Sequence, residues 1–216
     1  MANITGGTAR IVEGIQHFQE SVFAAKESLF RRLGEGQSPH ALFITCCDSR
    51  IDPNLLTQTE PGELFIHRNI GNQVPPYSVL SGERATLEYS IKTLGIREII
   101  VCGHSKCGAM QGLLAADALR EMPDVAQWLT HARAILPGVE QAAAKLSPAE
   151  KLNLAIQANV LLQLEHLKTY YFVADAISAG RLRLHGWVYF IESGQVTAYV
   201  PDKERFVPLA EAARLT

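Results

Sequence analysis

Two short segments of this chain carry side chains that can bind a metal ion, and the first follows an apolar run at residues 41–44. In it, Cys46, Asp48 and Arg50 place a thiol, a carboxylate and a guanidinium at every second position. Side chains at every second position of an extended chain point to the same side. If the chain stays extended past the expected strand, these three groups converge on one spot.

The second segment is Gly103-His104-Ser105-Lys106-Cys107-Gly108. His104 and Cys107 are three positions apart where a strand is expected to give way to a helix, so both can face one point. The helix N-terminus favours the thiolate form of Cys107, which is the form that binds metal. Together with Cys46 they make a Cys2His set, which is typical of zinc, and three protein ligands leave a fourth position open, as in catalytic zinc sites. The distance in sequence between Cys46 and His104 is too long for a zinc-finger loop.

The chain has two further cysteines, Cys47 and Cys102. Cys47 follows Cys46 along the strand and should point to the opposite side, and Cys102 lies within another expected strand. We expect both to be small, buried apolar groups. Disulfide bonds are not expected, because the N-terminus has no secretory signal pattern and cytosolic thiols stay reduced.

Hydrophobic periodicity and glycine or proline breaks predict strands alternating with helices, which is typical of an α/β fold with a mostly parallel sheet. The first helix has no evident partner, so it is either an arm that lies across another subunit or a surface helix on its own core. We expect an N-terminal helical arm (1–36) and one catalytic α/β domain (37–216) with flanking helices and an antiparallel edge strand. The expected strands are 41–46, 63–68, 97–102, 182–192 and 195–200, and the expected helices are 8–34, 80–94, 106–119, 124–135, 148–169 and 172–179.

The composition is that of an ordinary folded protein, with 47% apolar and 19% charged residues among 216. The formal net charge is −2 and no long run of one sign occurs, which argues against a nucleic-acid or anionic-membrane surface. No stretch approaches the roughly 20 apolar residues of a membrane span. A cytoplasmic location is therefore the expectation.

The two metal-binding segments together resemble the signature of β-class carbonic anhydrases. The likeness covers nearly the whole chain, through residues 62–69, 75–77, 88–89, 100–105 and 184–189. It implies reversible hydration of CO2 to bicarbonate and a proton by a zinc-bound hydroxide, with one Zn2+ per subunit held by Cys46, His104 and Cys107. It also implies that the N-terminal helix embraces a partner, giving a homodimer or a dimer of dimers.

The carboxylate and guanidinium of the first segment then have specific roles. Asp48 can accept a hydrogen bond from the hydroxide, and Arg50 can hold that carboxylate away from the metal in a bidentate pair. A plain structural ion pair is the alternative. Because two thiolates cancel the charge of Zn2+, we expect further help from groups around the ligands.

The resemblance also assigns substrate-binding positions. Gln37 resembles the amide that polarises CO2 or holds bicarbonate. Phe65, Ile70 and Tyr89 match positions that line the apolar CO2 pocket, some of them across the dimer interface. The alternatives are a loop glutamine and ordinary core side chains. His67 is either a proton relay or a packed histidine.

The family has two active-site states, and in one of them the equivalent of Asp48 binds zinc until the pH rises. Gln37 and residues 74–77 favour the open state, although residues 67–69 also occur in the switching branch. Residues 81–84 replace a usual glycine-rich turn and could alter the pocket floor or the interface. Two other functions remain open, a CS2 or COS hydrolase on the same scaffold and a non-catalytic protein that binds zinc or bicarbonate.

Overall fold

The computed structural model describes residues 6–215, and the chain divides into two compact units, Met1–Ser38 and Pro39–Thr216. Residues 1–5 and 216 of the two predicted ranges lie outside the described residues. The boundary predicted after residue 36 stays a prediction.

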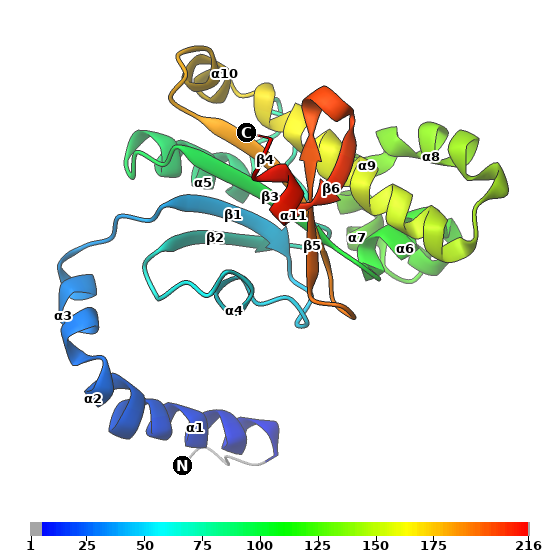
Figure 1. Ribbon diagram of the computed structural model, residues 1–216. Helices are drawn as coiled ribbons and strands as arrows, with labels where there is room; N and C mark the ends of the chain where they lie inside the picture. The colour runs from blue at the N-terminus through cyan, green and yellow to red at the C-terminus, as the bar shows by residue number, and fades with distance from the viewer. Residues whose placement is uncertain (1–5, 216) are drawn as a thin grey trace. The chain divides into compact units, whose positions relative to one another are not determined.

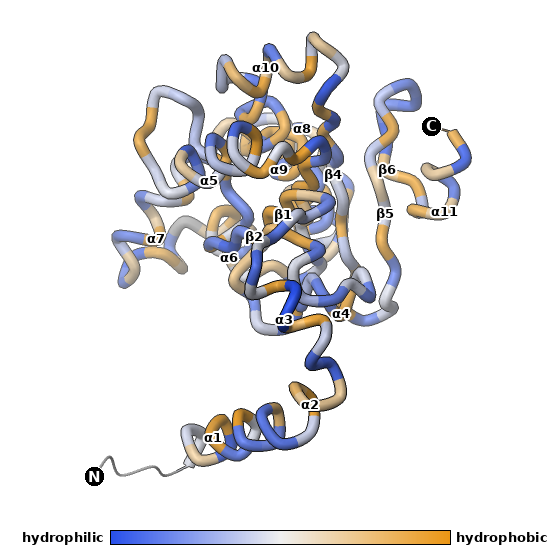
Figure 2. The backbone as a smooth tube through the Cα atoms, turned by 90° about the vertical axis from the view of Figure 1, so that its left-hand side faces the viewer, coloured by the Kyte–Doolittle hydropathy of each residue, from blue (hydrophilic) through white to orange (hydrophobic). Residues whose placement is uncertain are grey.

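The N-terminal unit is helical, and hydrophobic and hydrophilic residues alternate along its first helix, α1 (Figure 2). Its segments are α1 (Gly7–His17), a π-helical turn (Phe18–Val22), α2 (Phe23–Ala25) and α3 (Glu27–Glu35).

The prediction of one unbroken helix over 8–34 is wrong, because Lys26 leaves the helical conformation (φ −121°, ψ 22°) between α2 and α3. The rings of Phe18 and Phe30 lie 5.4 Å apart. Twelve residues of straight helix would span about 18 Å, so this aromatic contact requires the chain to bend.

The second unit is built on one six-stranded sheet with the order β2-β1-β3-β4-β5-β6 (Figure 1). The strands β2, β1, β3 and β4 pair in parallel, whereas β5 and β6 pair antiparallel. The strands are β1 (Ala41–Cys46), β2 (Leu64–Asn69), β3 (Glu98–His104), β4 (Arg183–Phe190), β5 (Gln195–Val200) and β6 (Arg205–Pro208). The predicted α/β class with a mostly parallel sheet is confirmed. The edge strand β6 was not predicted, because its four residues are too short for an alternating pattern.

Helices flank this sheet, and most of the buried apolar side chains form one cluster that joins the strands to several helices, among which α9 packs on β3 and β4. The helices are α4 (Pro53–Thr57), α5 (Gly82–Lys92), α6 (Gly108–Leu114), α7 (Pro123–Trp128), α8 (Leu136–Ala142), α9 (Pro148–Lys168), α10 (Tyr171–Ser178) and α11 (Leu209–Ala212). The predicted helix over 106–119 ends early, since Ala115 (φ −122°, ψ 80°) closes α6 and a 3₁₀ segment follows. The predicted helix over 124–135 becomes 3₁₀ from Leu129 onward.

Helix α9 begins as its sequence predicts. The Ser147 side chain accepts a hydrogen bond from the backbone N–H of Glu150, and the Glu150 carboxylate accepts one from that of Ser147. This capping box satisfies two N–H groups that a helix start leaves unpaired.

Gly103 lets α9 approach the carboxyl end of β3 closely. A Cβ atom at this position would lie 2.9 Å from a Val160 methyl and 3.1 Å from an Ile156 methyl. Only a hydrogen atom fits there, so the helix packs directly against the strand next to His104.

The strand order reverses between β1 and β3. From β1 the chain crosses to β2 on one side and then to β3 on the other. The carboxyl ends of the strands at such a switch point form a crevice that binds ligands in open α/β sheets. In the described part of the chain, no helix is both long and apolar enough to cross a membrane.

Candidate metal centre

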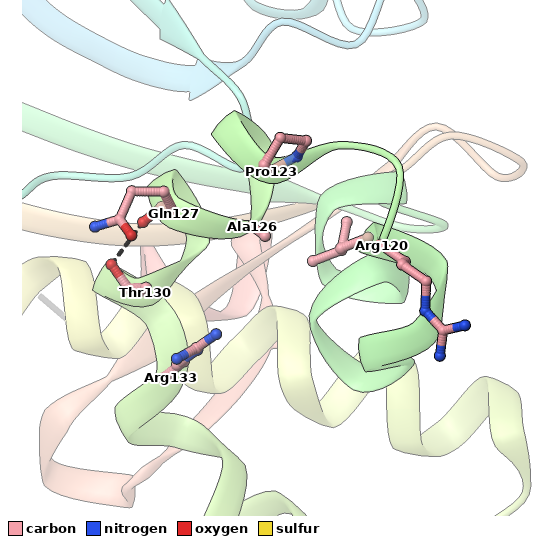
Figure 3. Close-up of a pocket in the computed structure, with 7 residues that line it drawn as sticks. Arg120, Pro123, Ala126, Gln127, Thr130 and Arg133 are labelled. Carbon is pink, nitrogen blue, oxygen red and sulfur yellow. Dashed lines mark hydrogen bonds between the residues drawn. The ribbon is translucent and has the colours of Figure 1, made fainter.

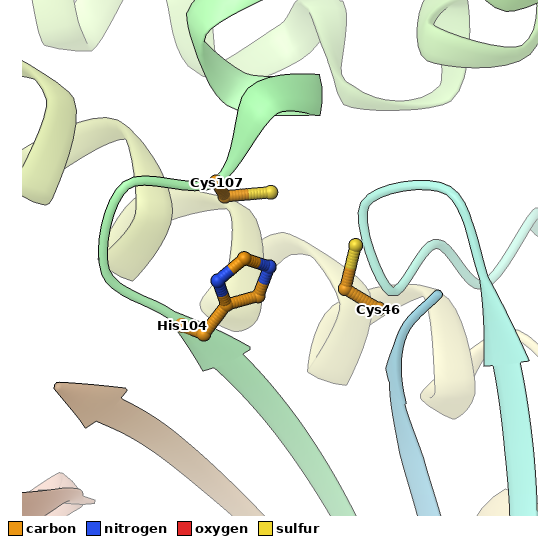
Figure 4. Close-up of side chains that lie close together, drawn as sticks. All are labelled: Cys46, His104 and Cys107. Carbon is orange, nitrogen blue, oxygen red and sulfur yellow. The ribbon is translucent and has the colours of Figure 1, made fainter. Parts of the chain in front are cut away.

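Cys46, His104 and Cys107 come together at this switch point, and Figure 4 shows their side chains directed at one another. Cys46 ends β1, His104 ends β3, and Cys107 is the residue immediately before α6. One ligand atom from each residue lies within 4.8 Å of the others. The exposed fractions of the three residues are only 5%, 0% and 1%. The sequence prediction that these residues converge is confirmed in geometry.

The chemistry of the three donors fits a zinc ion. The Nδ1 atom of His104 lies 2.9 Å from the backbone carbonyl oxygen of Ser105, so it carries the proton and donates to that oxygen. The other ring nitrogen, Nε2, is buried and has no hydrogen-bond partner among the described residues. A buried nitrogen lone pair directed at two thiols is costly unless a cation binds there, and two sulfurs with one nitrogen are ligands that zinc prefers.

The two cysteines titrate as a pair. A hydrogen bond from Cys107 lowers the pKa of the Cys46 thiol, and the backbone N–H of Gly71, 3.4 Å from Cys46 Sγ, lowers it further. The same contact with Cys46, together with burial, raises the pKa of Cys107. One thiolate therefore forms readily in the protein alone, and a cation that neutralises both charges favours the second.

Asp48 and Arg50 form a two-pronged ion pair beside the cluster. Arg50 donates from Nε to Asp48 Oδ1 (2.9 Å) and from an Nη atom to Oδ2 (2.7 Å). These hydrogen bonds hold the pKa of Asp48 well below its usual range. Asp48 Oδ2 also lies 3.8 Å from His104 Nε2, so an ionised carboxylate lies next to the predicted ligands.

The backbone conformation that brings Asp48 and Arg50 together is a turn and not the extended chain that was predicted. β1 ends at Cys46, and the chain then turns, with the Arg50 and Ile51 N–H groups donating to the Asp48 side chain and carbonyl. Because alternation of side chains stops with the strand, Cys47 is exposed. The prediction that Cys47 is buried is wrong, whereas Cys102, inside β3, is fully buried as predicted.

Two further residues position the ligand loops and were not assigned roles from the sequence. Arg68 on β2 donates to the carbonyl oxygens of Cys46 (3.0 Å) and Asp48 (2.7 Å). The Ser105 hydroxyl donates to Glu192 (2.7 Å) and accepts from the N–H of Ile191 (3.0 Å). A charged residue inside a predicted strand was the available signal for Arg68.

The four predicted substrate-binding residues do not form one cluster, in contrast to the three predicted metal ligands. Ile70 follows the carboxyl end of β2 and is 43% exposed. Phe65 packs against Tyr89, with ring centroids 6.0 Å apart. Phe65 pairs with Leu42, four residues before Cys46, which places it about 13 Å along the sheet from the cluster. Gln37 is exposed and belongs to the N-terminal unit. The roles of these four residues stay predictions.

Residues 81–84, which replace the expected glycine-rich turn, start α5 and bury the carboxylate of Glu83. Ser81 caps the helix, and Glu83 is buried with its Oε1 3.0 Å from His67 Nε2 and 3.0 Å from Asn69 Nδ2. Thr86 Oγ1 lies 3.3 Å from the other ring nitrogen of His67. His67 is thus a packed, hydrogen-bonded histidine.

We expect this buried pair to make the protein sensitive to acid. Burial raises the pKa of Glu83, but the hydrogen bond from His67 and further polar contacts outweigh it and lower the pKa to about 2 from an ordinary 4.5. A carboxyl with a depressed pKa stabilises the fold above pH 4.5 and loses that contribution as the pH falls toward 2. Relative to Glu83→Gln, the free energy of unfolding should fall by roughly 3 kcal/mol across this window.

Urea unfolding at several pH values, with a chelator present so that metal release does not contribute, measures this difference. The exposed Glu88→Gln is the matched control on the same helix. A wild-type minus Glu83→Gln difference that stays constant from pH 5 downward would contradict the expectation.

A separate surface cavity of about 360 Å3 lies along α7 and the 3₁₀ segment after it (Figure 3). Among the lining residues, the Thr130 hydroxyl donates to the Gln127 carbonyl (2.6 Å), and Arg120 is paired with Asp117 (2.9 Å), which lies outside the lining. Its described lining has no histidine, cysteine or carboxylate, so it offers no second metal centre. The lining residues are Leu119, Arg120, Pro123, Ala126, Gln127, Thr130 and Arg133.

Comparison with known proteins gives one consistent result. The family model described as carbonic anhydrase matches residues 41–196. The carbonic anhydrase of Pseudomonas aeruginosa is 46% identical over 202 residues, covering 93% of this chain and 91% of the relative. That of Synechocystis sp. is 46% identical over 192 residues, covering 88% of this chain and 70% of the relative.

Solved structures agree with this result. The β-carbonic anhydrase CcaA superposes with a TM-score of 0.91 at 44% identity, covering 94% of this chain and all (100%) of that one. A β-carbonic anhydrase of Sordaria macrospora, described as tetrameric, superposes with a TM-score of 0.81 at 27% identity, covering 88% of this chain and 95% of that one.

The chain belongs to the carbonic anhydrase family. Its fold and its Cys2His cluster place it in the β class, whose members include the solved structures above. The protein is therefore an enzyme that catalyses the reversible hydration of CO2 to bicarbonate and a proton. The CS2 or COS hydrolase and the non-catalytic zinc protein are not favoured, since these relatives are named carbonic anhydrases.

Proposed function

We propose that each subunit hydrates CO2 at one Zn2+ ion held by Cys46, His104 and Cys107, with Asp48 and Arg50 as the catalytic pair. The observation that carries this assignment is the two-pronged Arg50–Asp48 contact, which places a carboxylate 3.8 Å from His104 Nε2. A zinc ion bound to such ligands supplies the Lewis acidity that makes water a nucleophile near neutral pH.

In this proposal Asp48 accepts a hydrogen bond from the attacking water and directs its lone pair toward CO2. The carboxylate can only accept hydrogen bonds while it is ionised, and its low pKa keeps it ionised at neutral pH. Arg50 engages both oxygens of Asp48 in hydrogen bonds and so keeps the carboxylate from binding the metal itself, which corresponds to the open state. Its Nη atom also donates to the Lys106 carbonyl (3.2 Å) and so anchors the pair to the second ligand loop.

The apolar wall of the CO2 site would be formed by Phe65, Ile70 and Tyr89, and Gln37 would hold the substrate oxygen. A small uncharged substrate requires an apolar pocket with few polar groups. Phe65 and Tyr89 pack on each other toward the far end of β2 from the cluster of their own chain. This separation favours a contribution of these two rings to the site of a second subunit.

Stopped-flow measurement of CO2 hydration on zinc-loaded protein, from about pH 6.5 to 9, tests the open site, since this range brackets a zinc-bound water near 7. We expect activity that persists through neutral pH. Activity confined to the alkaline part would contradict the open state and place Asp48 on the metal at rest. No activity with about one zinc per chain would contradict the assigned roles.

We further propose that the subunits form homodimers or dimers of dimers through the N-terminal helices. The apolar side chains of Ile11, Ile15, Phe18 and Phe23 are all exposed in the single chain. Several large apolar side chains exposed together on one segment are typical of protein–protein interfaces. The tetrameric relative from Sordaria macrospora is consistent with this assembly. The cytoplasmic location remains a prediction from the sequence.

The double variant Ile15→Glu with Phe18→Glu should dissociate the assembly, because it places two charges at exposed apolar positions, one in α1 and one in the π-helical turn that follows it. Sedimentation velocity should then give a subunit-sized species instead of a dimer or tetramer. Gln16→Glu, which changes an exposed polar residue on the same helix, should sediment like the wild type. A double variant that keeps the wild-type sedimentation coefficient would rule out this interface.

A further inference from the structure

Gly71 connects a predicted metal ligand to the interior of the protein. Its backbone N–H lies 3.4 Å from Cys46 Sγ and donates to it. The residue has a φ of +77°, and a Cβ atom there would lie 3.0 Å from the Cβ of Ala109. Both the left-handed backbone and the close packing require glycine.

Two buried amide side chains bind the carbonyl of this residue, and a third binds those two. Asn159 Nδ2 and Gln73 Nε2 both donate to the Gly71 carbonyl oxygen, at 3.0 and 2.7 Å. Gln163 Nε2 donates to Asn159 Oδ1 (2.9 Å) and to Gln73 Oε1 (3.2 Å). We call Gln73, Asn159 and Gln163 the amide network.

The amide network is closed and fully buried. Gln73 Nε2 also donates to Asn159 Oδ1 (2.9 Å), and Gln163 Oε1 accepts from the N–H of Val74 (2.8 Å). The exposed fractions of Gln73, Asn159 and Gln163 are 0%, 1% and 0%.

Asn159 and Gln163 are one helical turn apart on α9, so both face the loop that contains Gly71. Their neighbours on this helix, Ile156, Val160 and Leu164, are buried apolar residues.

The amide network fixes the Gly71–Asn72 peptide group at its carbonyl oxygen, and Trp128 Nε1 fixes the preceding Ile70–Gly71 group, whose N–H contacts Cys46, by donating to the Ile70 carbonyl (2.8 Å). An apolar side chain in the network could not orient a peptide group in this way, whereas a satisfied polar network does so and thereby restrains the backbone of Gly71 from its carbonyl side.

We propose that Gln73, Asn159 and Gln163 are positioning residues of the metal centre, which hold the Gly71 N–H on the sulfur of Cys46. This inference rests on the proposed metal site. A hydrogen bond to a ligand thiolate withdraws electron density from the sulfur, so the thiolate donates less charge to a bound cation. The amide network thereby offsets part of the neutralisation that two thiolate ligands cause.

The test compares Asn159→Leu and Gln73→Met with the wild type. Each variant removes one of the two donors to the Gly71 carbonyl and replaces the amide by an apolar side chain of similar length. Zinc affinity is measured by competition with a chelator, and the cobalt(II)-substituted protein is measured for its thiolate-to-cobalt absorption band. We expect zinc affinity to fall about 10- to 100-fold, because Cys46 is no longer held in the position that binds metal, and this loss of positioning outweighs the stronger donation of the freed thiolate. We expect the cobalt band to move to longer wavelength, because an unbonded thiolate gives up an electron more readily.

Two additional variants keep the result interpretable. Gln163→Met removes a residue that touches Gly71 only through the other two, and we expect smaller changes in the same directions. It also supplies the test if Asn159→Leu does not fold. Leu167→Ala opens a cavity at a fully buried position of α9 outside the network, so it should lower the melting temperature and leave the cobalt band in place.

Network variants that melt earlier, as Leu167→Ala does, but keep the wild-type cobalt band and zinc affinity would overturn the proposal, since the network would then be purely structural. A wild-type protein without any thiolate-to-cobalt band would overturn the metal site itself, and this proposal with it. These two failures give different spectra and are therefore distinguishable.

Discussion

The variant His104→Ala should contain far less than one zinc per chain after purification and should hydrate CO2 only at the uncatalysed rate. His104 supplies Nε2, a ring nitrogen that has no hydrogen-bond partner among the described residues, and the residue is 0% exposed. Two thiols alone leave the metal with an incomplete set of ligands, and a zinc enzyme without its metal has no means of activating water. Metal analysis and stopped-flow assay of the same preparation measure both effects.

His40→Ala is the matched control, because His40 is a histidine in the same unit whose side chain is largely exposed. This variant should keep both zinc and activity. Full zinc content and wild-type activity in His104→Ala would show that the metal is bound elsewhere, and the assigned ligand set would be wrong.

The second large effect is expected for Asp48→Asn, which should bind zinc normally but lose 10²- to 10⁴-fold in turnover, the usual contribution of a positioned acid–base group. The substitution keeps the size of the side chain but exchanges one oxygen acceptor for an NH2 donor. It also disrupts the two-pronged contact with Arg50. Comparing zinc content with CO2 hydration separates this loss from a loss of metal.

A second aspartate in the same loop provides the control. Asp52 caps α4 by accepting from the N–H of Leu55 (3.1 Å), and asparagine caps helices about as well as aspartate. Asp52→Asn should therefore keep wild-type activity and stability. If Asp48→Asn hydrates CO2 as fast as Asp52→Asn, the pair of Asp48 and Arg50 is only structural.

Much of the site could be predicted from sequence because its residues mark the ends of strands. Cys46 and His104 each follow an apolar run, the second of them rich in β-branched residues, and parallel strands bring their carboxyl ends to one edge of the sheet. The short spacing of His104 and Cys107 then fixes the third ligand. The elements that position these ligands were predictable for the same reason.

Features that depend on contacts between distant residues could not be predicted. The exposure of Cys47 depends on where the strand pairing stops, and the break at Lys26 depends on how three phenylalanine rings pack. Glutamines and asparagines in a helix carry no signal of burial, so the roles of Asn159 and Gln163 became visible only with Gly71 beside them.

The position of the ligands on β1 and β3 also determines when the metal can be acquired during folding. Cys46 reaches His104 only when these two strands are paired, and the chain between them contains β2 and α5. Closing so long a segment is entropically costly before its contacts form. A zinc ion bound at this site therefore stabilises the paired strands over the unfolded chain, so that metal supply changes the stability of the folded protein as well as the fraction of active molecules.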